Sequence, residues 1–252
     1  RPIFKDKAVL QSNYLPDNIP HRDEYLKNVA KILAPALRKE RPSNLFIYGK
    51  TGTGKSLCVN HVLNKMKNVS TAREIPLKIV LINCKLRKVA DTEYRILLEI
   101  LKQLGKEMPS TGISTNDLYK ELYEIMDSQK RTVILVLDEI DALIKKAGDD
   151  ILYNLTRINP ELKSSEVCIV GITNDLTVMD SVDSRVKSSL NEEEVVFLPY
   201  NAVQIQDILR ERSYLAFREG VLDEEVIPMC SAYAAREHGD ARRALELLRF
   251  AG

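Results

Sequence analysis

Five apolar runs, rich in β-branched residues, recur along the chain at 45–48, 77–84, 132–137, 167–173 and 195–198. Between them, apolar residues repeat at the three- and four-residue spacing of helices. Short buried strands that alternate with helical segments are typical of a parallel sheet joined by crossover helices. The pattern therefore predicts an α/β fold with a five-stranded parallel sheet flanked by helices.

One interval contains two helical patterns. Apolar residues lie at helical spacing between Tyr94 and Leu104 and again between Leu118 and Met126. The residues between the two patterns, 105–115, include a Met-Pro-Ser-Thr-Gly sequence that is typical of a loop. We therefore predict a helical hairpin between the second and third strands.

The strand pattern stops after residue 198, and the rest of the chain is helical in character. We expect helices at about 202–219, 223–237 and 240–250, with Gly220 and Gly239 as their stops. This change predicts an N-terminal extension over residues 1–14, a base domain over 15–200 and a small all-helical lid domain over 201–252.

The composition indicates an ordinary globular protein: 44% of the residues are hydrophobic and 29% are charged. The apolar runs are too short to span a bilayer, so we expect no membrane partner. With 37 basic and 36 acidic residues the net charge is only +1, so contact with nucleic acid would need a local basic patch. The four cysteines lack zinc-like spacing, and we expect buried, reduced thiols in a cytosolic protein.

The strongest chemical motif is Gly49-Lys-Thr-Gly-Thr-Gly-Lys-Ser56, which follows the first apolar run and opens a helical pattern. This sequence fits GxxxxGK[ST], in which glycines let backbone N–H groups surround phosphate oxygens. Lys55 would reach the β- and γ-phosphates, and the Ser56 hydroxyl would bind Mg²⁺. The predicted nucleotide contacts in this segment are Lys50, Thr51, Gly52, Thr53, Gly54, Lys55, Ser56 and Leu57.

A second motif ends the third predicted strand, where an apolar run is followed by Asp138 and Glu139. The carboxyl end of a strand in such a sheet faces the ligand edge. Asp138 would hold Mg²⁺, and Glu139 would orient and deprotonate an attacking water, which makes hydrolysis possible. Asp141 fits a helix N-cap better than a catalyst.

Three further polar residues are candidates for sensing or stabilising phosphate charge. Asn174 follows the fourth strand, where it could meet a γ-phosphate or its water, or could simply cap the next turn. Arg242 would project from a helix capped by Asp240, although a solvated helix face is the alternative. Arg185 lies between the fourth and fifth strands and could supply transition-state charge to a neighbouring subunit.

Taken together, these motifs and their order resemble the AAA+ ATPase module. The stretches 44–55, 171–175, 185–190 and 238–245, with Leu15-Pro16 and His21-Arg22, resemble the archaeal origin-recognition initiator family, over essentially the whole chain. The resemblance implies that the segment 15–22, including His21 and Arg22, and the hinge residue Tyr200 border the adenine of ATP or ADP, and that Arg212 belongs to the nucleotide site. It also implies that Asn174, Arg185 and Arg242 are the sensor-one, arginine-finger and sensor-two residues.

The same resemblance implies partners. They are duplex origin DNA, the replicative helicase and other initiator subunits, with a DNA-touching helical insertion mapped onto 91–117. Lys85, Arg87 and Lys88 would add positive charge there, or would simply be solvated. Family members carry a winged-helix domain after the lid, and because the sequence stops at Gly252 we expect that domain to be absent.

These observations favour an ATP-binding, slowly hydrolysing replication initiator that uses its ATP or ADP state as a switch. Two alternatives stay open. A motor or clamp-loader-like subunit would turn over ATP rapidly with a partner, and an ADP-locked scaffold would retain nucleotide with negligible turnover.

Overall fold

The computed structural model describes residues 3–86 and 92–251 and divides into two compact units. We call them the loop–lid unit, whose described residues lie in 3–26, 49–61 and 197–251, and the sheet unit, in 27–48 and 62–196. Within the described ranges, no helix is long and apolar enough to cross a membrane.

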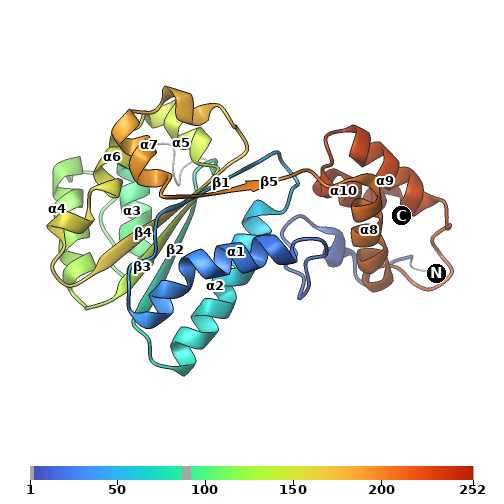
Figure 1. Ribbon diagram of the computed structural model, residues 1–252, viewed down its shortest axis with the longest axis horizontal. Helices are drawn as coiled ribbons and strands as arrows, with labels where there is room; N and C mark the ends of the chain where they lie inside the picture. Colours follow the sequence, from blue (N-terminus) through green and yellow to red (C-terminus); the bar gives the residue numbers. More distant parts are fainter. Residues whose placement is uncertain (1–2, 87–91, 252) are drawn as a thin grey trace. The chain divides into compact units, whose positions relative to one another are not determined.

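The sheet has five strands in the order β2-β3-β4-β1-β5 (Figure 1). The strands are β1 Leu45–Gly49, β2 Leu77–Asn83, β3 Thr132–Asp138, β4 Glu166–Thr173 and β5 Glu193–Phe197. The pairs β1–β4, β2–β3 and β3–β4 are parallel. The predicted five-stranded α/β fold is therefore confirmed, with each strand within two residues of its expected bounds.

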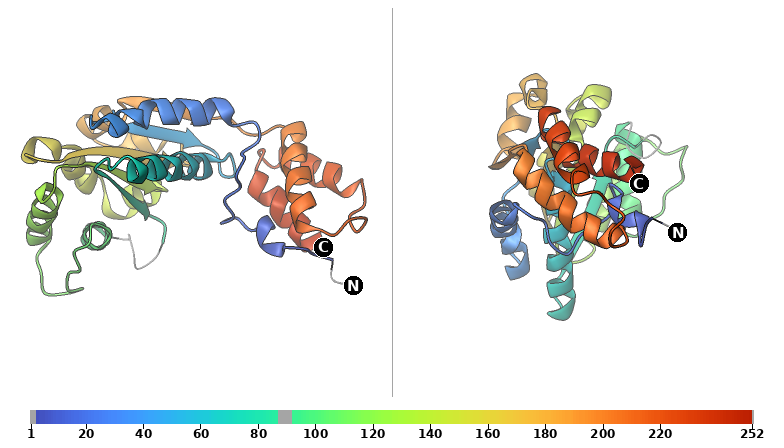
Figure 2. Two further views of the ribbon diagram at one scale, coloured as in Figure 1. Left: turned by 90° about the horizontal axis from the view of Figure 1, so that it is seen from below. Right: turned by 90° about the vertical axis from the view of Figure 1, so that its right-hand side faces the viewer.

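Helices cover both faces of this sheet. Successive side chains of a strand point to opposite faces, so each face carries apolar residues that the helices bury. Phe46, Val80 and Leu135 share one apolar cluster with residues of α3 to α7. Figure 2 shows α1 and the α3–α4 pair on opposite sides of the sheet. The bounds are α1 Asp23–Leu33, α2 Lys55–Ala72, α3 Glu93–Gln103, α4 Thr115–Asp127, α5 Ile140–Ala147, α6 Asp150–Thr156 and α7 Ser184–Leu190.

The predicted helical hairpin is present as α3 and α4. The Thr92 side chain caps α3 by accepting the Arg95 N–H, and Ser114 caps α4 by accepting the Asp117 N–H. Buried leucines and isoleucines of both helices join the core of the sheet unit. Asp91, the first residue of the predicted DNA-contacting insertion, and the nearby Arg87 and Lys88 lie outside the described residues.

The loop–lid unit is mainly helical, with α8 Ala202–Ala216, α9 Val226–Arg236 and α10 Ala241–Ala251 as its lid. Ile205, Leu209 and Leu248 form its core with Val9 and Leu10 of the short 3₁₀ helix Lys7–Leu10. The prediction that Gly220 ends α8 was wrong. The helix ends at Ala216 because Phe217 turns extended and forms a β-bridge with Phe4.

Candidate functional site

Positive φ angles shape the segment that joins β1 to α2. Gly52 has φ +74° and Gly54 has φ +89°, values that favour glycine. A Cβ on Gly52 would lie 1.7 Å from the Asp240 carboxylate, and one on Gly54 would lie 3.0 Å from the Tyr200 hydroxyl. Asp240 and Tyr200 therefore approach the loop backbone so closely that glycine is favoured at both positions.

Lys55 begins α2 and is buried beneath this loop. Its ammonium donates hydrogen bonds to the carbonyl oxygens of Gly49, at 2.7 Å, and Lys50, at 2.8 Å. The Thr53 hydroxyl donates to the same Lys50 carbonyl at 2.8 Å. The loop is therefore closed on itself around the lysine, while Ser56 and Leu57 are half-buried on the next positions of the helix.

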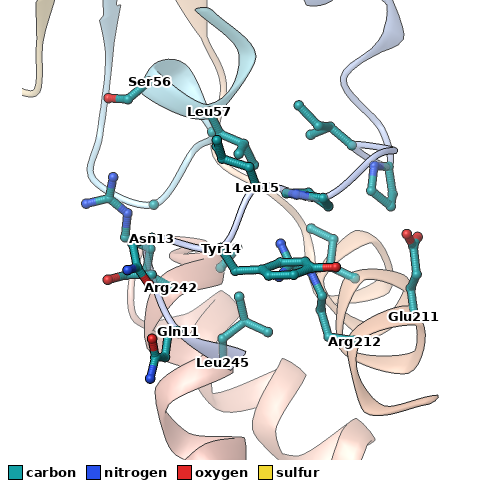
Figure 3. Close-up of a pocket in the computed structure, with 18 of the residues that line it drawn as sticks. Gln11, Asn13, Tyr14, Leu15, Ser56, Leu57, Glu211, Arg212, Arg242 and Leu245 are labelled. Atoms are coloured by element: carbon teal, nitrogen blue, oxygen red, sulfur yellow. The ribbon is translucent and has the colours of Figure 1, made fainter. Parts of the chain in front are cut away.

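A pocket of about 310 Å³ lies in the loop–lid unit, which is within the size range of small-molecule sites. Figure 3 shows Tyr14 extending across it between Leu57 and Leu245, with Ser56 above and Arg242 at one side. Its walls come from the segment 11–20, from loop and helix residues between 52 and 60, and from the lid. Apolar walls beside a glycine loop suit a base and its phosphates.

Predicted residues contribute to this pocket unequally. The lining includes Gly52, Gly54, Ser56, Leu57, Tyr200, Arg212 and Arg242. Lys50, Thr51, Thr53 and Lys55 belong to the loop but do not line the pocket. Sequence reasoning missed Tyr14, Asn60, Ile208, Glu211 and Leu245 as lining residues, because nothing in a local pattern shows which apolar side chains face a cavity.

Arg212 is a buried cation on α8. Its Nη1 donates to the Val9 carbonyl at 2.7 Å, and its guanidinium lies 4.5 Å from the centroid of the Tyr14 ring. Burial lowers the pKa of this guanidinium, since removal from water disfavours the charged form. Arg212 therefore ties the N-terminal segment to the lid at the wall of the pocket.

Arg22 and His21 lie beside the pocket and are not among its lining residues. The Arg22 side chain is buried and donates to the carbonyl oxygens of Thr53, at 2.9 Å, and Leu198, at 2.7 Å. His21 instead pairs with Asp207 of α8 at 2.8 Å. Arg22 therefore supports the phosphate loop through its hydrogen bond to the Thr53 carbonyl. A role for either residue in binding adenine stays a prediction.

The start of α10 holds Arg242 next to the phosphate loop. The predicted N-cap is confirmed, since the Asp240 carboxylate accepts the backbone N–H of Arg242 at 2.9 Å and that of Arg243 at 3.3 Å. The Ala241 N–H donates to the Gly52 carbonyl at 3.1 Å. The exposed Arg242 side chain therefore starts from a helix end that is bonded directly to the loop.

The sheet unit gathers a second set of predicted residues at one sheet edge. Asp138 pairs in register with Asn83 of β2 and Ile172 of β4, so the strands end together. Asn174 follows β4 and is half-buried, and Asp175, not Asn174, caps the next turn by accepting the Thr177 N–H. Asp138, Glu139 and Asn174 thus share the carboxyl edge of the sheet, as parallel strands require.

Glu139 occupies a backbone conformation that side chains rarely adopt, with φ 54° and ψ 44°. It stands at the N-cap position of α5, and the Asp138 carboxylate accepts its N–H at 2.9 Å. The prediction of Asp141 as the N-cap was therefore wrong. Asp141 lies in the first turn and accepts a hydrogen bond from the Thr173 hydroxyl at 3.0 Å.

Arg185 lies on α7 and is engaged by its own chain. Its Nε and Nη2 donate to the two oxygens of Asp183 at 3.1 and 3.0 Å, and its guanidinium lies 4.9 Å from the centroid of the Tyr153 ring. These hydrogen bonds lower the pKa of the Asp183 carboxyl to about 2. The guanidinium is exposed, so a second subunit could reach it.

The chain matches the family described as "AAA domain" over residues 38–176 and the "Cdc6 AAA+ ATPase-type lid domain" over residues 206–252. The "ORC1-type DNA replication protein" of Thermococcus kodakarensis is 53% identical over 256 residues, which cover 100% of this chain and 61% of that protein. This chain therefore spans about three-fifths of the length of that relative.

Solved structures agree with these matches. The Aeropyrum pernix ORC1 protein, solved in complex with DNA, has 46% identity and a TM-score of 0.91, covering 99% of this chain and 64% of that one. Cdc6p from Pyrobaculum aerophilum has a TM-score of 0.85 at 24% identity over 99% of this chain and 66% of that one, which shows the shared fold. On these matches and on its glycine loop, sheet and lid, the chain belongs to the archaeal ORC1-type family of AAA+ ATPases.

Proposed function

We propose that this chain is the ATP-binding switch of a DNA replication initiator. One observation carries the proposal: a single pocket is lined by the phosphate loop, by the N-terminal segment and by the lid. Nucleotide in this pocket would touch all three, so a change from ATP to ADP would alter the contacts of the lid. A ligand shifts an equilibrium only through such differential contacts.

The residues fit a nucleoside triphosphate. The glycine loop at Gly52 and Gly54 would present backbone N–H groups to phosphates, and Lys55 would supply a positive charge beneath them. The Tyr14 ring and the apolar side chains of Ile208 and Leu245 would hold the base, with Arg212 behind the ring. Arg242 would contact the terminal phosphate from the lid.

Mg²⁺ is proposed to arrive with the nucleotide. Among the described residues, no group of three or more His, Cys, Asp or Glu side chains could hold a metal ion by itself. The Ser56 hydroxyl and the Asp138 carboxylate are the hard oxygen donors that this ion prefers, and phosphates and water usually complete its shell. When bound, the ion would neutralise phosphate charge.

Hydrolysis is proposed to be slow and regulatory. Glu139 would accept the proton of the attacking water, and Asn174 would orient that water. The Asp183 carboxylate holds Arg185 within its own chain, which supports the proposal that Arg185 completes a neighbour's site only after assembly. Duplex origin DNA, other initiator subunits and the replicative helicase are the proposed partners, since relatives bear the name of DNA replication proteins and the A. pernix structure includes DNA.

Nucleotide binding tests the proposal most directly. Lys55→Ala should abolish tight binding of ATP and ADP in calorimetry, because the loop loses its buried cation. Glu139→Gln should bind ATP as tightly as the parent chain and release no phosphate. Unchanged affinity in the first variant would remove the phosphate loop from the site, and unaltered turnover in the second would remove Glu139 from its role.

The two rival functions give different kinetics. An ADP-locked scaffold is favoured by the segment 11–20, which walls the pocket and would slow release; it predicts ADP that survives purification with negligible turnover. A motor or clamp-loader-like subunit predicts rapid, partner-stimulated turnover. Anisotropy of an origin duplex and a scrambled duplex, with ATP and with ADP over a salt series, would test DNA reading by this chain.

A further inference from the structure

The sheet unit contains a second pocket, of about 610 Å³, at the edge where the strands begin. Its lining includes Pro76, one residue before β2, and Thr132 and Glu166, the first residues of β3 and β4. We call it the amino-edge pocket. Asp138 is the last residue of β3 and Asn174 directly follows β4, so both lie at the opposite, carboxyl edge of the same sheet. This pocket is therefore separate from the residues assigned above to hydrolysis.

Positive charge dominates the lining of the amino-edge pocket. Among its lining residues Glu166 is the single acid, against five basic side chains, Lys39, Arg41, Lys130, Arg131 and Lys163. Within the described part of the chain, no carboxylate lies within ion-pair distance of the three lysines, whereas Arg41 pairs with Glu192 at 3.4 Å. In a chain whose net charge is +1, this is a strong local concentration.

Arg131 is the most informative of the five. Its Nη2 donates to the Ile125 carbonyl at 2.9 Å, and its Nε is buried without a hydrogen-bond partner among the described residues. Burial lowers the pKa of this guanidinium. Among the described residues, no carboxylate forms an ion pair with Arg131. A half-buried cation without such a partner is unfavourable by itself, and an anion in the pocket would compensate it.

The loop that carries Lys163 is held by hydrogen bonds to the Asp127 side chain. The Asp127 carboxylate accepts the backbone N–H groups of Lys163, Ser164 and Ser165, at 2.8, 2.9 and 3.2 Å. The Ser165 hydroxyl also donates to the Gln129 carbonyl at 2.8 Å. The loop therefore keeps its shape without a ligand, which lowers the ordering cost of binding.

We propose that the amino-edge pocket binds phosphate groups. Several cations around one concave site can neutralise the multiple charges of adjacent phosphates, and the planar fork of an arginine suits phosphate oxygens. A free polyphosphate and the backbone of a nucleic acid share this chemistry. The inference is independent of the nucleotide site, because it uses only residues of the opposite sheet edge.

The first test uses sodium tripolyphosphate in calorimetry, with ADP and Mg²⁺ present to occupy the phosphate loop. The parent chain should bind one further equivalent. The double variant Lys130→Glu/Lys163→Glu should lose at least about tenfold in affinity, because two contacts become repulsive. The control Lys65→Glu/Lys67→Glu reverses the same charge at exposed α2 positions outside the pocket and should bind as the parent does.

The second arm measures duplex DNA by fluorescence anisotropy over a salt series. If the DNA backbone is the natural source of phosphate, the pocket variant should weaken DNA binding and lower the salt slope by about two relative to the control. If only tripolyphosphate binding falls, the source is a small polyphosphate. Both results support the site.

Two outcomes would overturn the proposal. One is equal tripolyphosphate affinity in the pocket variant and the parent chain, with equal DNA affinity. The other is preference of the pocket for a poly-glutamate peptide over tripolyphosphate, which would assign it to an acidic protein segment. Thermal melting and ADP binding of both double variants check that the fold is intact.

Discussion

The guanidinium carbon of Arg22 lies 3.7 Å from the centroid of the Tyr200 ring. The same cation donates hydrogen bonds to the carbonyl oxygens of Thr53 and Leu198. Tyr200 in turn places its hydroxyl against Gly54 of the phosphate loop. One buried arginine thus joins the chain entering α1, the phosphate loop and the residue before the lid.

Replacing Arg22 with alanine should lower the free energy of unfolding by about 3 kcal/mol, because one buried and one partly buried carbonyl acceptor and a ring face lose their partner. Nucleotide affinity should fall as well, since the loop loses its support. Denaturant unfolding and calorimetry measure the two effects. Arg210→Ala, at an exposed position of α8, should change neither.

Gly52→Ala should impair the phosphate loop more than its backbone angle alone explains. The added methyl group would meet the Asp240 carboxylate at 1.7 Å, in addition to the strain of φ +74°. Gly220→Ala is the matched control, with φ +73° and open space around its Cβ position. We expect about 1 kcal/mol of destabilisation in the control and a larger loss, with weakened ATP binding, in Gly52→Ala. Equal losses in both would mean that the loop readily moves away from Asp240.

Glu139 stores backbone strain at the position proposed for catalysis. Glu139→Gly should raise the free energy of unfolding by about 0.5 kcal/mol while abolishing hydrolysis, because glycine adopts positive φ without the Cβ penalty. Glu139→Gln keeps the strain and should leave the stability unchanged. Glu74→Gly, at φ 52° on the surface, should show the same stabilisation with hydrolysis intact.

Thiol reactivity should single out Cys230. Cys58, Cys84 and Cys168 are buried, and burial raises the pKa of each to about 12, so their reactive thiolate is scarce. Cys230 is only partly buried, which departs from the expectation that all four thiols are buried. Ellman's reagent should modify one thiol quickly in the native chain and four after denaturation. Cys230→Ser should remove the fast phase, and a remaining fast phase would contradict the buried packing of the others.

The pH dependence of the Asp183–Arg185 pair has a defined sign. The Asp183 pKa is lowered to about 2 in the folded chain, whereas the pKa of an unperturbed aspartate is about 3.9. Its stabilising effect is therefore complete above about pH 4 and is lost as the pH falls towards 2. Carboxyl NMR should give a midpoint near 2 for Asp183, rising towards about 4 in Arg185→Ala. An unchanged midpoint in that variant would show that the pair does not form in solution.

The sequence predicted the sheet well because each strand contains a short run of apolar, often β-branched residues between polar segments. Val133 to Leu137 is buried along its full length, so burial and pattern coincide. The glycine loop and the two acids at the end of β3 could also be recognised from the sequence, because their chemistry depends on residue type and on position relative to a strand. The end of α8 was not, since it depends on a bridge between Phe217 and the distant Phe4.

The burial of charged side chains was the harder part. In the sequence alone, nothing distinguishes Arg22 and Arg131 from exposed cations. The folded chain shows Arg22 against the Tyr200 ring and Arg131 half-buried in the wall of the amino-edge pocket. The N-cap of α5 was likewise assigned wrongly, to Asp141. Glu139 takes that place in a left-handed conformation that no propensity favours for glutamate.

The bridge between Phe4 and Phe217 also bears on how the chain is made. The N-terminal segment finds its partners more than 200 positions later, as in the hydrogen bond from Arg212 to the Val9 carbonyl. During synthesis, the N-terminal segment would therefore lack its partners on and after α8 until that helix had left the ribosome. Contacts between residues far apart in the sequence form slowly. The nucleotide pocket would therefore be among the last parts of the newly synthesised chain to fold.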